Sequence, residues 1–230
     1  MTTIAARWAE VKARVEAACE RAGRSAAEVT IVAVSKTHPA SAVVEAAAAG
    51  ATDFGENYAQ ELADKIANVA LVPEVGTLRW HYIGRLQRNK AKLVAGQVAL
   101  VHAVDTVELA DELAKRASGV LQPILLAVNL AGETTKGGVT GESAEPIARA
   151  LAAVPGVRLD GLMTMPPYSD DPEASRPQFE ALRILRARLS DALGVPLPIL
   201  SMGMSGDFEV AIACGATHVR VGTAIFGSRS

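Results

Sequence analysis

The sequence is poor in the residues that mark several classes of protein. It has only two cysteines, Cys19 and Cys214, without metal-ligand spacing, which argues against a disulfide-rich secreted domain and a metal site. Aromatic residues make up 4% of the chain, and the interleaved aromatics of a single-stranded nucleic-acid binder are missing. Its apolar runs are too short or interrupted to span a bilayer, and residues 1–10 lack a signal-peptide core. We therefore expect a soluble, cytoplasmic protein without metal, nucleic acid or membrane among its ligands.

Neither sign of charge dominates. The chain has 23 basic and 25 acidic side chains, a net charge of −2, so no partner of strong opposite charge is indicated. Half of the residues are hydrophobic and 21% are charged, a composition typical of a well-packed core. A length of 230 residues suits one α/β barrel, and we treat residues 1–230 as a single domain.

Short β-rich runs alternate with helical stretches along the whole chain. The expected strands are Thr30–Ser35, Thr52–Phe54, His81–Ile83, Leu100–Ala103, Ile124–Asn129, Arg158–Met163, Ile199–Met202 and His218–Val221. The expected helices are Ser41–Ala49, Ala59–Val69, Arg88–Val94, Val107–Ala117, Ala144–Ala153, Ala174–Leu193 and Asp207–Cys214. Eight such units predict an α/β fold, a single (β/α)8 TIM-type barrel.

An additional helix is expected before the first strand, over residues 3–22. Trp8, Val11, Val15 and Ala18 recur at spacings of three and four, which indicates one apolar face that packs outside the barrel. Gly23 is the expected stop.

Lys36 directly follows the apolar run Val29–Ser35. A lysine at the carboxyl end of a buried strand lies where a barrel keeps its ligands. A partly desolvated amine has a lowered pKa and forms a Schiff base with an aldehyde. The alternative is a lysine whose stem lies along apolar surface while its amine reaches water.

The loops after the seventh and eighth strands are rich in small residues. Ser201, Gly222 and Thr223 lie where barrels often bind a phosphate, and small residues let backbone N–H groups approach an anion. The alternative is that the glycines only permit tight turns. Ser205 is predicted to cap the helix Asp207–Cys214.

Arg220 lies inside an otherwise apolar strand, where a charge needs a partner. A structural carboxylate is one candidate, and Asp207 or Glu209 could supply it. A ring nitrogen of a bound cofactor is the other.

Several segments together resemble the pyridoxal-phosphate homeostasis protein family, over nearly the whole chain and in order. They are Val34-Ser35-Lys36-Thr37, Phe54-Gly55-Glu56-Asn57-Tyr58, His81-Tyr82-Ile83-Gly84-Arg85-Leu86-Gln87, Asn89-Lys90, Gly161-Leu162-Met163, Leu200-Ser201-Met202-Gly203-Met204-Ser205 and Arg220-Val221-Gly222-Thr223-Ala224-Ile225-Phe226-Gly227. Proteins of that family resemble the amino-terminal barrel of alanine racemase without the second domain of that enzyme.

The resemblance implies a site for pyridoxal 5′-phosphate (PLP). It implies that Lys36 binds PLP as an internal aldimine and that Arg220 faces the pyridine nitrogen. The residues implied to surround the cofactor are Asn57 and His81 beside the ring and Ser201, Gly222 and Thr223 at the phosphate.

The implied function is intracellular PLP homeostasis, by buffering or delivery to PLP-dependent apo-enzymes, without efficient turnover. A racemase of this kind takes its second base, a tyrosine, from a second domain, and no further block of strands follows the eighth unit. Because the second base is missing, we assign no catalytic residue. We also expect a monomer. A PLP-dependent amino-acid racemase and a Schiff-base barrel aldolase are the alternatives.

One further lysine and one cluster of basic residues stand out in the loops and helix starts. Lys136 is a candidate secondary acceptor of PLP through the resemblance, and otherwise a solvated loop lysine. Arg85, Arg88, Lys90 and Lys92 are expected on a solvated helix face.

Overall fold

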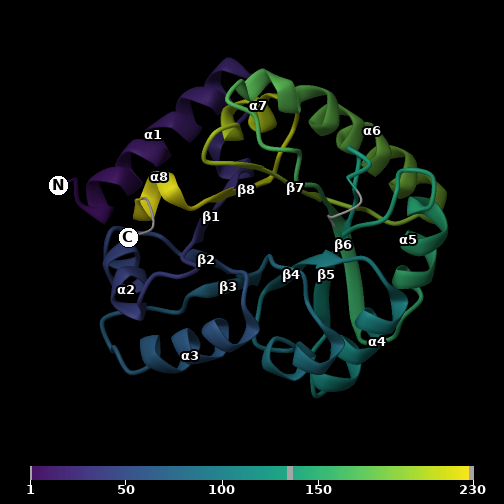
Figure 1. The fold of residues 1–230 in the computed structure, drawn as a ribbon, viewed down its shortest axis with the longest axis horizontal. Helices are drawn as coiled ribbons and strands as arrows, with labels where there is room; N and C mark the ends of the chain where they lie inside the picture. Colours follow the sequence, from purple (N-terminus) through teal and green to yellow (C-terminus); the bar gives the residue numbers. More distant parts are fainter. Residues whose placement is uncertain (1, 134–136, 228–230) are drawn as a thin grey trace.

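Eight parallel strands close into a barrel in their sequence order, with helices around the outside (Figure 1). The structure, a computed structural model, describes residues 2–133 and 137–227. The strands are β1 Thr30–Val34, β2 Asp53–Glu56, β3 Arg79–Tyr82, β4 Leu100–Val104, β5 Gln122–Ala127, β6 Val157–Met163, β7 Ile199–Met204 and β8 His218–Val221. The predicted (β/α)8 barrel is confirmed.

The helices follow the predicted order, with two differences. They are α1 Ile4–Arg21, α2 Ala40–Ala48, α3 Ala59–Val69, α4 Val107–Arg116, α5 Ala144–Ala152, α6 Arg176–Leu193, α7 Phe208–Ala213 and α8 Thr223–Phe226, with 3-10 turns η1 Ala26–Glu28, η2 Arg88–Leu93 and η3 Pro172–Ser175. The segment predicted as the helix Arg88–Val94 is thus a 3-10 turn. Its buried residues Ala91 and Val94 are three apart, the repeat of that turn. The four-residue helix α8 was not predicted.

Helix α1 packs outside the barrel, as its periodicity predicts. The Thr3 hydroxyl accepts a hydrogen bond from the Ala6 N–H at 3.2 Å at its start. The apolar stripe Trp8, Val11, Val15 and Ala18 is buried, and α1 lies along α7 and α8 (Figure 1). The helix ends before Gly23, whose φ of 66° suits glycine.

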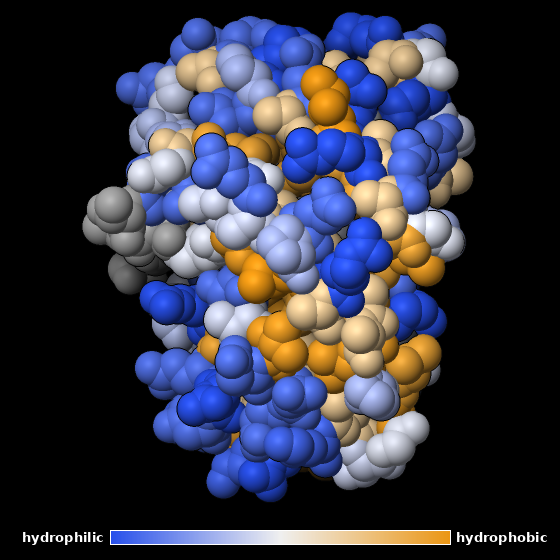
Figure 2. Space-filling view, turned by 90° about the vertical axis from the view of Figure 1, so that its right-hand side faces the viewer, coloured by the Kyte–Doolittle hydropathy of each residue, from blue (hydrophilic) through white to orange (hydrophobic). Residues whose placement is uncertain are grey.

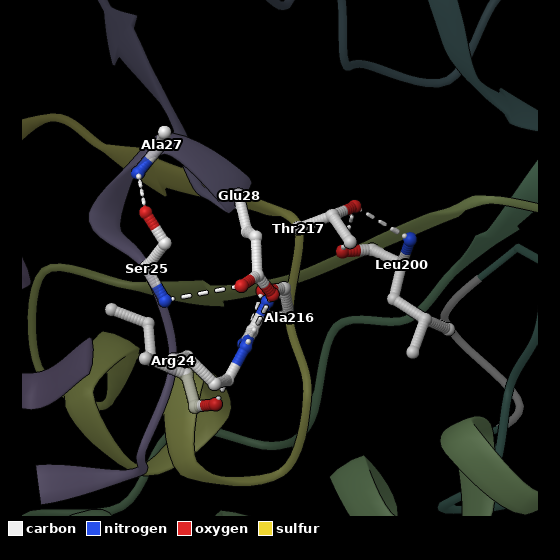
Figure 3. Close-up of polar contacts among 8 residues, drawn as sticks. Arg24, Ser25, Ala27, Glu28, Leu200, Ala216 and Thr217 are labelled. Carbon is white, nitrogen blue, oxygen red and sulfur yellow. Dashed lines mark hydrogen bonds and ion pairs between the residues drawn. The ribbon is translucent and has the colours of Figure 1, made fainter. Parts of the chain in front are cut away.

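The amino ends of the strands are tied together by the loop after α1 (Figure 3). Ser25 and Glu28 form a capping box, and the Arg24 guanidinium donates to the Ala216 carbonyl at 2.9 Å. The Thr217 hydroxyl bonds to the backbone at the start of β7. These contacts join β1, β7 and β8 at their amino ends, and the loop that bears Lys36 lies at the opposite end of the barrel.

The two faces of the barrel wall differ in chemistry. The outer face packs apolar residues against the helices in one large cluster. The inside holds a small apolar cluster of Leu100, Leu125 and Met163. Buried polar side chains also lie on the strands, among them His81, His102, Ser201, His218 and Arg220. Such groups need partners inside the barrel, and these partners define the site below.

The surface over α5 and α6 is mostly hydrophilic, with apolar side chains gathered toward its middle and lower part (Figure 2). In residues 2–133 and 137–227, no helix has the length and apolar character needed to cross a membrane. Within the same ranges no group of His, Cys, Asp and Glu has the geometry of a metal site.

Candidate functional site

Lys36 lies half-buried in the turn after β1. The backbone of the residues on either side of it is hydrogen-bonded to side chains of α3. The Lys65 ammonium donates to the Ser35 carbonyl at 2.6 Å, and the Thr37 N–H donates to the Glu61 carboxylate at 2.5 Å. Lys65 and Glu61 form an ion pair at 2.7 Å. The residues before and after Lys36 are therefore held by one charged cluster. Thr37 itself has φ of 67°, a strained conformation for a threonine.

The centre of that cluster is a buried ion pair. The Lys65 ammonium lies 2.6 Å from the Glu56 carboxylate, and both residues are at most 4% exposed. The Ser35 hydroxyl donates to the same carboxylate oxygen at 2.6 Å. Burial raises the pKa of Glu56 against the opposing effects of Lys65 and Ser35. The cluster thus connects the end of β2 with the end of β1.

The loops after β1 and β8 lie side by side. Strands β1 and β8 pair with Ala33 opposite Val221, and a Cβ on Gly222 would lie 3.4 Å from the Val34 carbonyl oxygen. The His38 and Phe226 rings stack with centroids 5.2 Å apart. Residues near Lys36 and the predicted anion loop of β8 are therefore brought together.

Ser205, in the loop after β7, contacts the backbone of the predicted anion loop after β8. Its hydroxyl oxygen accepts hydrogen bonds from the Gly222 N–H at 3.2 Å and the Ala224 N–H at 3.4 Å. The prediction that Ser205 caps α7 is wrong, because Asp207 is the cap residue and its carboxylate accepts from the Met204 N–H. The sequence signal that assigns Ser205 to this group is its position in the small-residue run after β7. Thr223 is exposed at the start of α8.

Arg220 is 5% exposed and bonds to neutral groups. Its guanidinium donates to the Ser201 hydroxyl at 2.7 Å and to the Thr164 carbonyl at 3.0 Å. Burial lowers the pKa of Arg220 to about 10, so the group stays charged at neutral pH. Ser201 is fully buried beneath it, and its phosphate contact stays a prediction.

Neither carboxylate predicted as a structural partner forms an ion pair with Arg220. Asp207 accepts hydrogen bonds from the Met204 N–H and the Ser175 hydroxyl, and Glu209 pairs with Arg14 at 2.7 Å. Among the described residues, Asp207 thus acts on Arg220 only through its charge, which opposes the lowering of the Arg220 pKa by burial.

The remaining predicted residues lie at different depths. Asn57 follows β2, and its side-chain oxygen is buried without a hydrogen-bond partner among the described residues. Its carbonyl accepts from the Tyr82 hydroxyl at 2.9 Å, and burial raises the pKa of Tyr82 to about 12. His81 is fully buried, with Asp53 at 2.9 Å and His102 at 3.0 Å from its two ring nitrogens. Lys136 lies outside the described residues.

A groove of about 1060 Å³ lies beside Asn57, between the loops that follow β2, β3 and β4. Its lining includes Tyr58, Arg85, Arg88 and Lys90. Three residues of the basic cluster thus face a hollow of the surface, where a plain solvated helix face was expected.

Comparisons with known proteins identify the family of the chain. The family model described as alanine racemase, N-terminal domain, matches residues 8–230. The pyridoxal phosphate homeostasis protein of Aquifex aeolicus is 45% identical over 97% of this chain and 97% of its own, and that of Pseudomonas aeruginosa is 46% identical over 100% and 97%. PipY of Synechococcus elongatus, solved with PLP bound, superimposes with a TM-score of 0.85 at 34% identity, over 98% of this chain and 100% of that one.

The resemblance drawn from the motifs is therefore confirmed, over the full barrel and from strand to strand. The chain belongs to the pyridoxal phosphate homeostasis protein family, and its barrel matches the family model of the alanine racemase N-terminal domain.

Proposed function

We propose that this protein binds PLP covalently through Lys36 and serves intracellular PLP homeostasis, as a buffer and donor of the cofactor. The names of its relatives and the PLP-bound PipY structure support this function. The single observation that carries it is the shared location of Lys36, Arg220 and the Ser205 loop at the carboxyl ends of adjacent strands.

The described residues fit this cofactor. When bound, PLP supplies an aldehyde and an electron-withdrawing pyridine ring. The Lys36 amine adds to the aldehyde carbon, a C=N bond forms and one water leaves. The N–H groups of Gly222 and Ala224, which now donate to the Ser205 hydroxyl at 3.2 and 3.4 Å, are suited to phosphate oxygens.

Four further residues complete the proposed pocket. Thr223 and Ser201 are proposed at the phosphate side, as the resemblance implies. Asn57 is proposed beside the ring, and its unpartnered buried side-chain oxygen fits a polar ligand atom. His81 is also proposed beside the ring, as the resemblance implies, and its two ring nitrogens contact His102 and Asp53.

Arg220 favours holding the cofactor over turnover. A guanidinium whose pKa is about 10 keeps its protons at neutral pH, so it donates a hydrogen bond to the pyridine nitrogen without protonating it. An unprotonated ring withdraws electrons weakly. The Tyr82 hydroxyl donates to the Asn57 carbonyl and the Tyr168 hydroxyl donates to Asp170. Both hydroxyl groups are thus engaged within the protein, which disfavours either tyrosine as the second base of a racemase.

The proposal extends to partners and state. We propose that the chain acts as a single-domain monomer in the cytoplasm and gives PLP to apo-enzymes. Lys136 is the proposed secondary acceptor during transfer. The racemase and aldolase alternatives are not favoured, because the relatives are named as homeostasis proteins.

Titration of the purified chain with PLP tests the function. We expect a saturable absorption band of the lysine-bound cofactor in the wild type and in Lys12→Ala, a control on α1. Lys36→Ala should lose that band and retain weak, phosphate-dependent binding. Holo protein should also reactivate a PLP-dependent apo-enzyme. An unchanged band in Lys36→Ala would overturn the proposal. So would rapid exchange of the α-hydrogen of alanine by the wild type.

A further inference from the structure

A chain of hydrogen bonds crosses the barrel below Arg220. Arg220 bonds to the Ser201 hydroxyl at 2.7 Å, and this hydroxyl lies 2.8 Å from His102 Nδ1. His102 Nε2 lies 3.0 Å from His81 Nδ1, and His81 Nε2 lies 2.9 Å from the Asp53 carboxylate. The members come from β8, β7, β4, β3 and β2, and none is more than 5% exposed.

The two ends of this chain fix the direction of its outer bonds. A guanidinium only donates, so the Ser201 oxygen accepts from Arg220. A hydroxyl oxygen has two acceptor sites, so towards His102 Nδ1 the Ser201 hydroxyl either donates its one hydrogen or accepts a second hydrogen bond. A carboxylate only accepts, so His81 carries its hydrogen on Nε2 and donates to Asp53.

The bond between the two histidines then has two possible directions. If Ser201 donates, His102 accepts at Nδ1 and donates from Nε2 to His81 Nδ1, and both rings are neutral Nε2–H tautomers. If Ser201 accepts, His81 must carry a hydrogen on both ring nitrogens; we take the first arrangement, which keeps a second charge out of the barrel interior beside Arg220. Burial and the neighbouring positive groups lower the pKa of His102 well below 6.5, which agrees with a neutral ring.

We propose that Asp53, His81 and His102 are positioning residues that orient Arg220 toward the cofactor ring, acting through Ser201. This inference rests on the proposed function, since it takes Arg220 to face the pyridine nitrogen. With Ser201 held as an acceptor and the Thr164 carbonyl at 3.0 Å, two directions of the guanidinium are fixed inside the barrel. Because the guanidinium is planar, these two hydrogen bonds also determine the direction of its remaining N–H bonds.

His218 provides a matched control. Its ring is buried within the same group, with centroids 6.1 Å from His102 and 5.9 Å from His81, yet its Nδ1 bonds to the Thr217 hydroxyl. Replacement of either histidine by leucine removes a buried ring, but only His102→Leu interrupts the path from Asp53 to Arg220.

The first test needs no variant and no cofactor. Nitrogen-15 NMR of the histidine rings in the apo protein at neutral pH should give His81 and His102 as neutral Nε2–H tautomers. An Nδ1–H or doubly protonated ring at either residue would overturn the chain.

The second test uses PLP. His102→Leu should bind PLP about tenfold more weakly, the effect of one misaligned bond to a charged group, with a shifted absorption band. His218→Leu should keep the band of the wild type. Equal spectra and affinities for both variants would overturn the positioning role, whereas failure of the wild type to bind PLP at all would overturn the proposed function alone. If His102→Leu does not fold, the wild-type NMR result decides.

Discussion

The turn that bears Lys36, the proposed PLP-binding residue, is held by neighbouring side chains. The Lys36 side chain offers an amine, but the peptides on both sides are fixed by Lys65 and Glu61. Lys65 is 4% exposed and donates to three oxygens, so it is a structural cation and a poor nucleophile. At this position the second lysine organises the turn that presents the first.

Lys65→Met should destabilise the protein by about 3–5 kcal/mol, because the Glu56 carboxylate stays buried without its cation. Urea unfolding measures the change. Arg116→Gln serves as the control, since it breaks an exposed pair with Glu112 and should cost no more than about 0.5 kcal/mol. Similar losses in the two variants would show that the Lys65 pair has no special role.

Ser205→Ala should weaken PLP binding about tenfold, through loss of one hydroxyl at a charged ligand. Fluorescence titration with PLP measures the affinity. Ser190→Ala, which removes an exposed hydroxyl bonded to the Val195 carbonyl, should leave the affinity unchanged. Full affinity in Ser205→Ala would assign the phosphate to other residues, with Ser201 as the next candidate.

At the scale of elements, the sequence predicts strands and long helices well and short segments poorly. The β-branched run at β1 and the apolar stripe of α1 each carry enough residues to show a period. Helix α8 has four residues, too few for any period, and forms through tertiary contacts. Among these, the Arg7 guanidinium donates to the Ile225 carbonyl at 2.7 Å. A contact across more than two hundred residues has no local signal.

The pairing of β6 with β7 requires glycine at one position. A Cβ on Gly161 would lie 1.9 Å from the Ile199 carbonyl oxygen, a backbone atom that cannot move alone. Gly161→Ala should therefore cost at least about 3 kcal/mol, at the upper end of the usual range for overpacking. Gly206→Ala, where nothing lies within 4 Å, should be close to neutral. Chemical denaturation of both variants tests this, and a neutral Gly161→Ala would contradict the strand spacing.

At the scale of the whole molecule, sequence reasoning found only part of the polar interior: it named His81, Ser201 and Arg220 but not their partners. Asp53, His102 and His218 gave no pattern, because their partners lie on other strands and meet only when the barrel closes. Lys36 and Arg220 stood out because each ends or interrupts an apolar run. The sequence thus identifies polar residues that interrupt an apolar run. It does not identify polar residues whose role comes from partners on other strands.

The buried histidines should make stability depend on pH. Burial lowers the pKa of His218 to about 3 and that of His102 well below 6.5, so the unfolded chain takes up protons that the folded one refuses. Stability is then complete above about pH 6.5 and falls as the pH decreases, and His218 alone accounts for about 2 kcal/mol of the loss at pH 5.

The variant His218→Leu isolates one of these contributions. Between pH 7 and pH 5 its unfolding free energy should decrease by about 2 kcal/mol less than that of the wild type. Urea unfolding at both pH values provides the comparison. Identical decreases in the two proteins would mean that His218 is protonated in the folded state.

The central claim is that one amine, on Lys36, holds the cofactor. Borohydride reduction of the PLP-bound protein, followed by proteolysis and mass mapping, tests it most directly. We predict a single reduced adduct, on the peptide that contains Lys36. An adduct confined to another lysine, with the Lys36 peptide unmodified, would contradict the account.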